Sequence, residues 1–121
     1  MSINRVFLSG RLGQTPELRT TDQGKAYTIL KIATNRYYSS EDQQLEAKTD
    51  WHDVFVWGKQ GENCHRYLSR GQAVSIEGFL KSYKSIENER ENYQKTIIQA
   101  LHVDFLSSKP DTQNLTSKIK S

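Results

Sequence analysis

Hydrophobic and polar residues alternate in five separate segments of the chain, a pattern typical of β-strands with one face on a core and one in solvent. In the second segment Leu30 and Ile32 fall on one side and Lys31 on the other. In the fourth segment Val74, Ile76 and Leu80 share the side predicted to be buried. The alternation predicts five strands, at residues 5–10, 26–35, 51–57, 73–83 and 95–106.

One segment between the third and fourth strands follows a helical period instead. Cys64, Tyr67 and Leu68 are spaced i, i+3, i+4 between Gly61 and Gly71, which predicts a short helix that ends at a glycine. The remaining segments are predicted as a long polar connection, a hairpin loop and a flexible tail, at residues 36–50, 87–92 and 107–121.

Three strands, a short helix and two further strands follow the element order of the OB-fold. We therefore expect a mainly all-β chain: a five-stranded antiparallel Greek-key barrel with one short helix between strands 3 and 4. A length of 121 residues suits one domain, which we place at residues 1–106, followed by the tail at 107–121.

The composition shows a mild excess of basic residues and few residues that could form a disulfide, a metal site or a catalytic site. Lysine and arginine number 17 against 14 aspartate and glutamate residues, a net charge of +3 that fits a polyanionic partner. A single cysteine permits no internal disulfide, and no signal-like or membrane-length apolar run is present, so we expect a cytoplasmic protein. No spacing of His or Cys suggests a metal site, and no carboxylate pair or nucleophile motif suggests catalysis. We expect neither an enzyme nor a cofactor.

The third strand carries large aromatic residues on the side that the core does not need. Val54 and Val56 occupy the core side, whereas Trp51, Phe55 and Trp57 lie on the other. A large aromatic side chain usually belongs to a core or a subunit interface. Here the valines already fill the core positions, so the two tryptophans favour a surface that stacks on flat ligands, and the role of Phe55 stays open.

Four segments resemble bacterial single-stranded DNA-binding proteins, in the order and spacing of that family. They read NRVFLSGRLGQTPELR, ILKIATNR, TDWHDVFVWGK and YLSRGQAVSIEGFL, and the resemblance runs from about residue 4 to residue 106. It implies an OB-fold, usually in a homotetramer, that coats single strands during replication, recombination and repair. It also implies a place at the bacterial nucleoid.

The resemblance further implies roles for particular residues. Trp51 and Trp57 fall at stacking positions, Tyr38 falls at a third, and His52 falls at a subunit interface. The family often carries another stacking tryptophan where this chain has Ser85, and Tyr83, two residues earlier, is a candidate substitute.

Phosphate contacts require cations along the same face as the stacking aromatics, because phosphate neutralisation supplies most of the non-specific binding energy. Asp53 and Glu77 share that face and are expected to repel a strand locally. The candidate cations are Arg5, Arg11, Lys31, Arg36, Lys59, Lys81 and Lys84.

Other interpretations stay open from the residues alone. A related primosomal adaptor would be a dimer, an RNA-binding OB module would use the same stacking, and a nuclease on this barrel would need a carboxylate cluster. Family members typically end in an acidic tip that docks replication and repair enzymes. Residues 107–121 carry Lys109, Lys118 and Lys120 against Asp111, so we expect no docking of that kind through them.

Overall fold

The computed structural model describes residues 1–85 and 93–107, with side chains except at 83–85, 93 and 94. The predicted hairpin loop and nearly all of the predicted tail lie outside these ranges. Within the described ranges, one helix and six strands follow one another: β1 (Val6–Leu12), β2 (Glu17–Thr20), β3 (Ala26–Ser39), β4 (Leu45–Trp57), α1 (Gly58–Tyr67), β5 (Ala73–Ser85) and β6 (Tyr93–Phe105).

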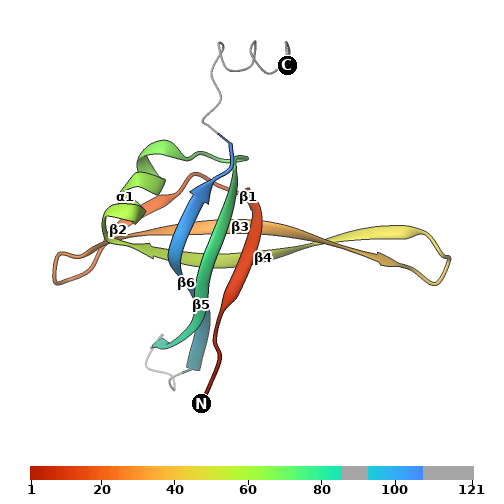
Figure 1. Cartoon of the computed structure of the whole chain (residues 1–121), viewed down its shortest axis with the longest axis horizontal. Coiled ribbons are helices and arrows are strands. Elements are labelled where there is room, and N and C mark those ends of the chain that lie inside the picture. Colours follow the sequence, from red (N-terminus) through yellow and green to blue (C-terminus); the bar gives the residue numbers. More distant parts are fainter. Residues whose placement is uncertain (86–92, 108–121) are drawn as a thin grey trace, which may run out of the picture.

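The strands form one sheet in the order β1-β5-β6-β4-β3-β2, and an additional pairing of β1 with β3 closes five of them into a barrel (Figure 1). The predicted mainly β barrel with one helix after its third long strand is confirmed. The pairings are antiparallel except between β4 and β6, which run parallel where Val54 lies opposite Ile98.

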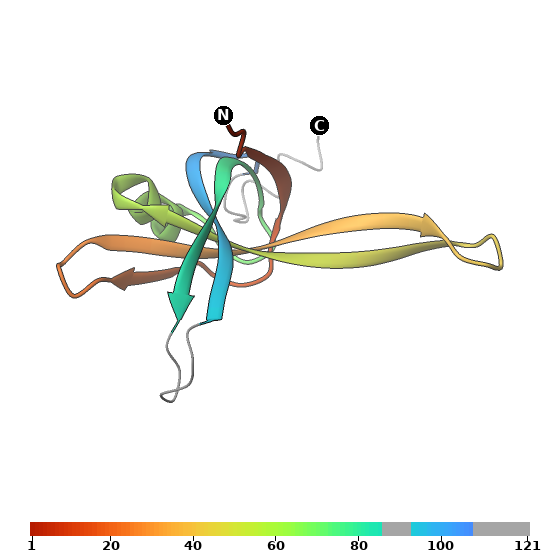
Figure 2. The same ribbon diagram turned by 90° about the horizontal axis from the view of Figure 1, so that it is seen from below.

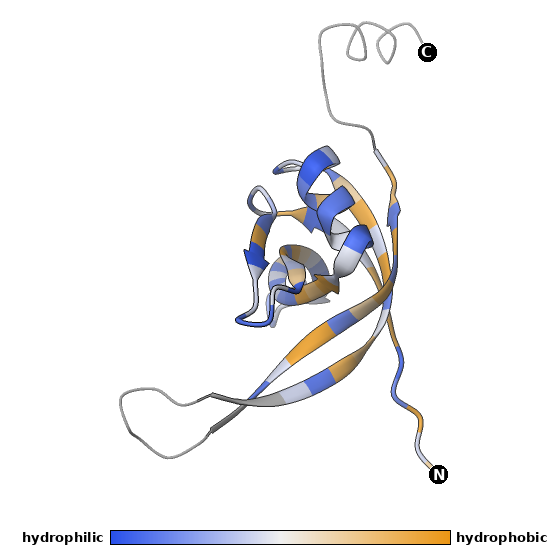
Figure 3. Cartoon of the chain, turned by 90° about the vertical axis from the view of Figure 1, so that its left-hand side faces the viewer, coloured by the Kyte–Doolittle hydropathy of each residue, from blue (hydrophilic) through white to orange (hydrophobic). Residues whose placement is uncertain are grey.

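Alternating side chains fill the barrel. Leu30, Ile32, Val54, Val56 and Ile76 are buried, as their positions in the sequence predict. Figure 3 shows hydrophobic and hydrophilic positions alternating along the strands.

The prediction was wrong for Leu80, whose side chain is 50% exposed. Leu80 keeps the inward parity of Val74 and Ile76, but it follows the irregularity between Glu77 and Gly78. The pairing of β1 with β5 begins at the Val6–Gly78 pair, so Leu80 lies beyond the part of β5 that β1 covers.

Most of the stretch predicted as a polar connection at residues 36–50 belongs instead to β3 and β4, and only residues 40–44 connect the two strands. The two strands stay paired out to Ser39 and Leu45 and project from the barrel as an arm, residues 36–48 (Figure 2). The side chains of the arm are exposed on both faces, so the hydrophobic alternation that marks a half-buried strand is absent from its sequence. Strand β2 was not predicted for the same reason, because all four of its residues are exposed.

Helix α1 closes one end of the barrel. Gly61 permits close approach, since a Cβ there would lie 2.2 Å from the carbonyl oxygen of Val56. The hydroxyl of Thr28 donates to the Gly61 carbonyl at 2.6 Å. Cys64 and Leu68 are buried as predicted, and burial raises the pKa of the Cys64 thiol to about 12. Tyr67, at the end of α1, is half exposed. This helix is too short and polar to span a membrane, and the described ranges contain no other helix.

Candidate functional site

The face of the sheet opposite the core carries a three-ring cluster at the end of β4. Tyr27 on β3 pairs directly across from Trp57, so both side chains point to the same side. The Tyr27 ring centroid lies 4.8 Å from that of Trp57 and 5.5 Å from that of Phe55. Aromatic rings in contact at such distances stabilise the structure, and they also present apolar surface. Tyr27 was not among the predicted site residues, although it shares the polar-side parity of Lys31.

Trp51 lies on the same face of β4 but without a neighbouring ring. Its cross-strand partner is Ala33, and its side chain is 60% exposed. The indole lies against the backbone of Gly13, where a Cβ would be 2.2 Å from Cζ3. The Gly13 amide donates to the Lys31 carbonyl at 2.9 Å, which fixes the backbone beneath the ring. Trp51 is therefore supported from below while much of its surface faces solvent.

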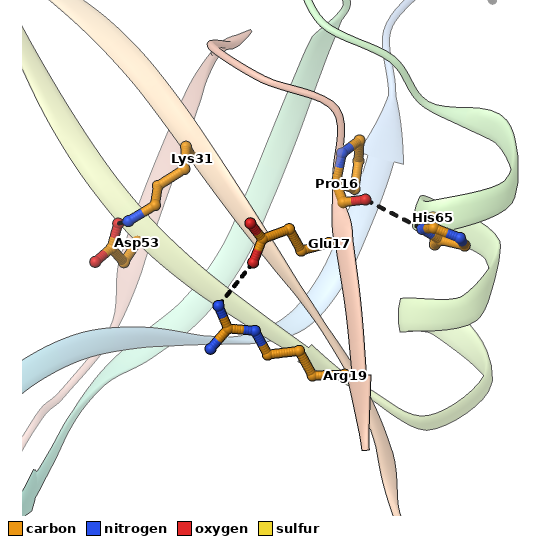
Figure 4. Close-up of polar contacts among 6 residues, drawn as sticks. All are labelled: Pro16, Glu17, Arg19, Lys31, Asp53 and His65. Carbon is orange, nitrogen blue, oxygen red and sulfur yellow. Dashed lines mark hydrogen bonds and ion pairs between the residues drawn. The ribbon is translucent and has the colours of Figure 1, made fainter. Parts of the chain in front are cut away.

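Charged side chains fill the space between Trp51 and the three-ring cluster. Asp53 accepts from Lys31 Nζ at 2.6 Å and lies 3.7 Å from Lys95 Nζ. Nearby, Glu17 accepts from Arg19 at 2.9 Å. Figure 4 shows the Lys31–Asp53 and Arg19–Glu17 pairs side by side. Asp53 was expected to repel a strand, but here two lysines compensate its charge.

These side chains line two adjoining hollows, of about 320 and 280 Å³, that share Arg19 and Phe55. Together we call them the outer groove. Lys81 lines the first and donates to Gln99 at 3.2 Å. A larger open hollow of about 980 Å³ continues from Trp57 and Lys81 towards residues 21–26. The outer groove is lined by Gln14, Glu17, Arg19, Thr21, Tyr27, Ile29, Lys31, Asp53, Phe55, Trp57, Lys81, Lys95, Ile97 and Gln99.

The predicted residues do not all meet at the outer groove. Lys31, Trp57 and Lys81 line it, and Trp51 lies on the same face of the sheet. Arg11 lies in register with Ala33 and donates to the Gly71 carbonyl at 2.9 Å.

Other predicted residues lie elsewhere. Arg36 is paired with Asp50, and its hydrogen bond lowers the pKa of that carboxyl below the ordinary value. By strand alternation Arg36 and Tyr38 point away from the Trp51 side, where Tyr37 lies instead. Lys59, on α1, lines a separate hollow that includes Phe105.

Tyr83 and Lys84 lie on β5, at positions whose side chains fall outside the described part. His52, predicted at an interface, is half-buried with Nε2 2.8 Å from the Thr34 hydroxyl. Among residues 1–85 and 93–107, no group of three or more His, Cys, Asp or Glu could hold a metal ion.

Comparison with known proteins agrees with this geometry. The model of the single-strand binding protein family matches residues 3–106. The chain is similar to single-stranded DNA-binding protein 1 of Synechocystis sp., 32% identical over 96% of this chain and 93% of that protein. It is also similar to the single-stranded DNA-binding protein of Halalkalibacterium halodurans, 38% identical over 86% of this chain and 61% of that protein. It spans about half, 54%, of a similar protein from Chlorobaculum tepidum.

Solved structures show the same likeness. A Plasmodium falciparum SSB in complex with single-stranded DNA superposes with a TM-score of 0.77 at 27% identity, over 88% of this chain and 97% of that one. The single-stranded DNA binding protein from Thermus aquaticus gives 0.74 at 28% identity, over 87% of this chain and 50% of that one.

Proposed function

The chain belongs to the single-strand binding protein family, and we propose that it binds and protects single-stranded DNA without sequence specificity during replication, recombination and repair. The observation that carries this proposal is Trp51, an exposed indole laid on Gly13 beside a groove that holds both aromatic rings and cations. Trp51 and Trp57 stack on bases, while Arg11, Lys31 and Lys81 contact phosphates.

The physical basis is what an unpaired strand offers at every nucleotide. Each nucleotide has one phosphate charge and one flat base face, whatever the sequence. Stacking of a base on an aromatic side chain contributes about 1–3 kcal/mol in OB-fold proteins of this class. Cations release counterions from the backbone and add a term that depends on salt. A groove with both features binds single strands of any sequence and needs no catalytic group, so the protein acts without catalysis.

The proposed site extends beyond the outer groove. Tyr38 and Arg36 act from the arm, which projects from the barrel. The proposed site also includes Lys59 on α1 and Tyr83 and Lys84 on β5. Of the described side chains among these five residues, Arg36, Tyr38 and Lys59 do not line the outer groove, and Arg36 and Tyr38 point away from the Trp51 side of the sheet.

We expect a homotetramer with His52 at a subunit interface. Four chains of +3 carry +12, which favours a strand wrapped over several subunits. Sedimentation should give four times the 14.0 kDa of one chain, whereas twice that mass would favour a dimeric adaptor. Because its partner is DNA, the protein is expected in the cytoplasm at the nucleoid.

The barrel, residues 1–106, is proposed as the binding unit, and residues 107–121 are proposed to lie outside it. Ser107 still contacts the barrel, since its hydroxyl accepts from the Ala73 amide at 3.0 Å. Removing residues 109–121 should therefore leave strand affinity almost unchanged, measured by the titration described next. A large loss would assign the tail to the binding site.

One titration tests the proposal. Tryptophan emission is followed while a mixed-sequence oligonucleotide is added, first as a single strand and then as a duplex. The single strand should quench most of the emission, and log affinity should fall by about 0.7 per phosphate contact for each unit of log salt. Equal binding of the duplex, or a salt-independent affinity, would contradict the proposal.

A further inference from the structure

The smaller hollow of the outer groove holds the Asp53 carboxylate, where a DNA-binding face is expected to carry only cations. We propose that Asp53 determines selectivity for unpaired strands: it offsets the charge of Lys31 and Lys95, so that binding depends on base stacking more than on phosphate attraction. This inference rests on the proposed function and assigns a role to one residue of the same site.

The geometry makes Asp53 a shared partner. Its Oδ1 lies 2.6 Å from Lys31 Nζ, and its Oδ2 lies 3.7 Å from Lys95 Nζ, so each carboxylate oxygen faces a different ammonium group. The Asp53 side chain is 23% exposed, against 39% for Lys31 and 50% for Lys95. The carboxylate thus lies deeper than the two cations that face it. A strand in the groove meets the lysines while they remain paired with Asp53.

Three strands bring this trio together. Lys31 on β3 lies directly across from Asp53 on β4, and Lys95 comes from β6, which pairs with β4 on its other side. On β4 Asp53 sits between Trp51 and Phe55 on the outer face, so its charge acts at the middle of the aromatic positions. No other described carboxylate in the outer groove faces two cations, since Glu17 is paired with Arg19 alone.

The charge count of the smaller hollow follows from these pairs. It is lined by three cations, Arg19, Lys31 and Lys95, and by two carboxylates, Glu17 and Asp53. The net charge of its lining is therefore +1, whereas the three cations alone would give +3. Duplex and single-stranded DNA both present phosphates, but only an unpaired strand presents base faces. Each phosphate contact contributes more to duplex binding, with a salt slope of about 0.9, than to single-strand binding, with a slope of about 0.7. Lowering the phosphate attraction therefore costs the duplex more affinity, and it leaves the stacking that only the single strand can make.

The test compares three variants with the wild-type protein by the titration above. Asp53→Asn removes the charge and keeps the shape. Asp104→Asn changes the net charge equally at the far end of β6, where Asp104 pairs with His102 outside the outer groove. The double variant Asp53→Asn with Lys31→Gln restores the net charge of the hollow. Thermal melting of each variant checks that it is folded.

Asp53→Asn should bind single strands more tightly and depend more steeply on salt. One added phosphate contact increases the ratio of variant to wild-type affinity by about 2.6-fold as salt falls from about 200 to about 50 mM. Affinity for duplex should rise by a larger factor, so the ratio of single-strand to duplex affinity should fall. The double variant should return towards the wild-type salt dependence, and Asp104→Asn should match the wild type.

Weaker binding by folded Asp53→Asn, or an unchanged salt dependence, would overturn the inference. An equal gain of single-strand affinity in Asp104→Asn would show that only the net charge of the protein matters, which would also overturn the inference. A constant ratio of single-strand to duplex affinity would overturn it as well. If the wild-type protein itself fails to bind single strands, the proposed function is wrong, which is a separate result.

Discussion

The two tryptophans of β4 have the same parity and face the same side of the sheet, yet they lie in different surroundings. Trp51 is 60% exposed and rests on the backbone of Gly13. Trp57 is half-buried, with its ring centroid 4.8 Å from that of Tyr27. The cross-strand neighbour explains the difference, because Trp51 lies opposite Ala33 and Trp57 lies opposite Tyr27.

This difference divides two tasks that a surface aromatic can perform. A ring that lies over a glycine keeps a face for a ligand and contributes little to folding. A ring that packs against other rings stabilises the sheet, and it offers the ligand only what its neighbours leave uncovered. We therefore expect Trp51 to act mainly in binding, and Trp57 to act in both binding and stability.

The largest effect on binding is expected for Trp51→Ala. Single-strand affinity should fall by about 1–3 kcal/mol, because one stacked base loses its partner. The free energy of unfolding should change by about 0.5 kcal/mol or less, as for other exposed positions. Fluorescence titration and chemical denaturation measure the two quantities, and Trp51→Phe, which retains a ring, should lose less affinity. Normal affinity with lowered stability would reverse the assignment.

Trp57→Ala should instead lower the free energy of unfolding, by about 2 kcal/mol, roughly half the cost of removing a fully buried tryptophan. The ring contact with Tyr27 is lost, and affinity for the single strand falls as well. Denaturant unfolding of Trp57→Ala beside Trp51→Ala makes the comparison direct. Equal stabilities of the two variants would show that the three-ring cluster does not support the sheet.

Much of the fold was predictable because half-buried strands carry their own periodicity. Val54 and Val56 identify the core side of β4, so the outward position of both tryptophans followed from alternation alone. The arm and β2 were not predictable in this way, since all their side chains except that of Ser40, at the tip of the arm, are exposed and no alternation marks them.

The candidate site was less predictable than the fold, because its contacts depend on strand register. Tyr27 meets Trp57 only through the pairing of β3 with β4, thirty residues apart in the sequence. Lys95 reaches Asp53 only because β6 lies beside β4. Parity placed Lys31 and Asp53 on one face, but it could not show that they form an ion pair.

A smaller effect on binding is expected for Gly13→Ala. The added Cβ would lie 2.2 Å from the Trp51 ring, so the indole must tilt or move away from the outer face. Single-strand affinity should fall by about 1 kcal/mol, the lower end of the range for a lost stacking contact. In a Trp51→Ala background the same change should have almost no further effect, because residues in contact are not additive. An equal loss in both backgrounds would mean that Gly13 acts independently of Trp51.

The smallest effect is expected for Tyr27→Leu, which replaces a ring with an aliphatic side chain and keeps the position apolar. The variant should lose about 0.5–1.5 kcal/mol of stability, the usual worth of an aromatic pair beyond its buried area. The loss should shrink when Trp57 is already alanine and stay unchanged when Trp51 is alanine, because only Trp57 lies opposite Tyr27. Denaturant unfolding of the single and double variants gives both coupling energies. Coupling of Tyr27 to Trp51 as strong as to Trp57 would show that the two tryptophans belong to one cooperative surface and that their separation into two tasks is wrong.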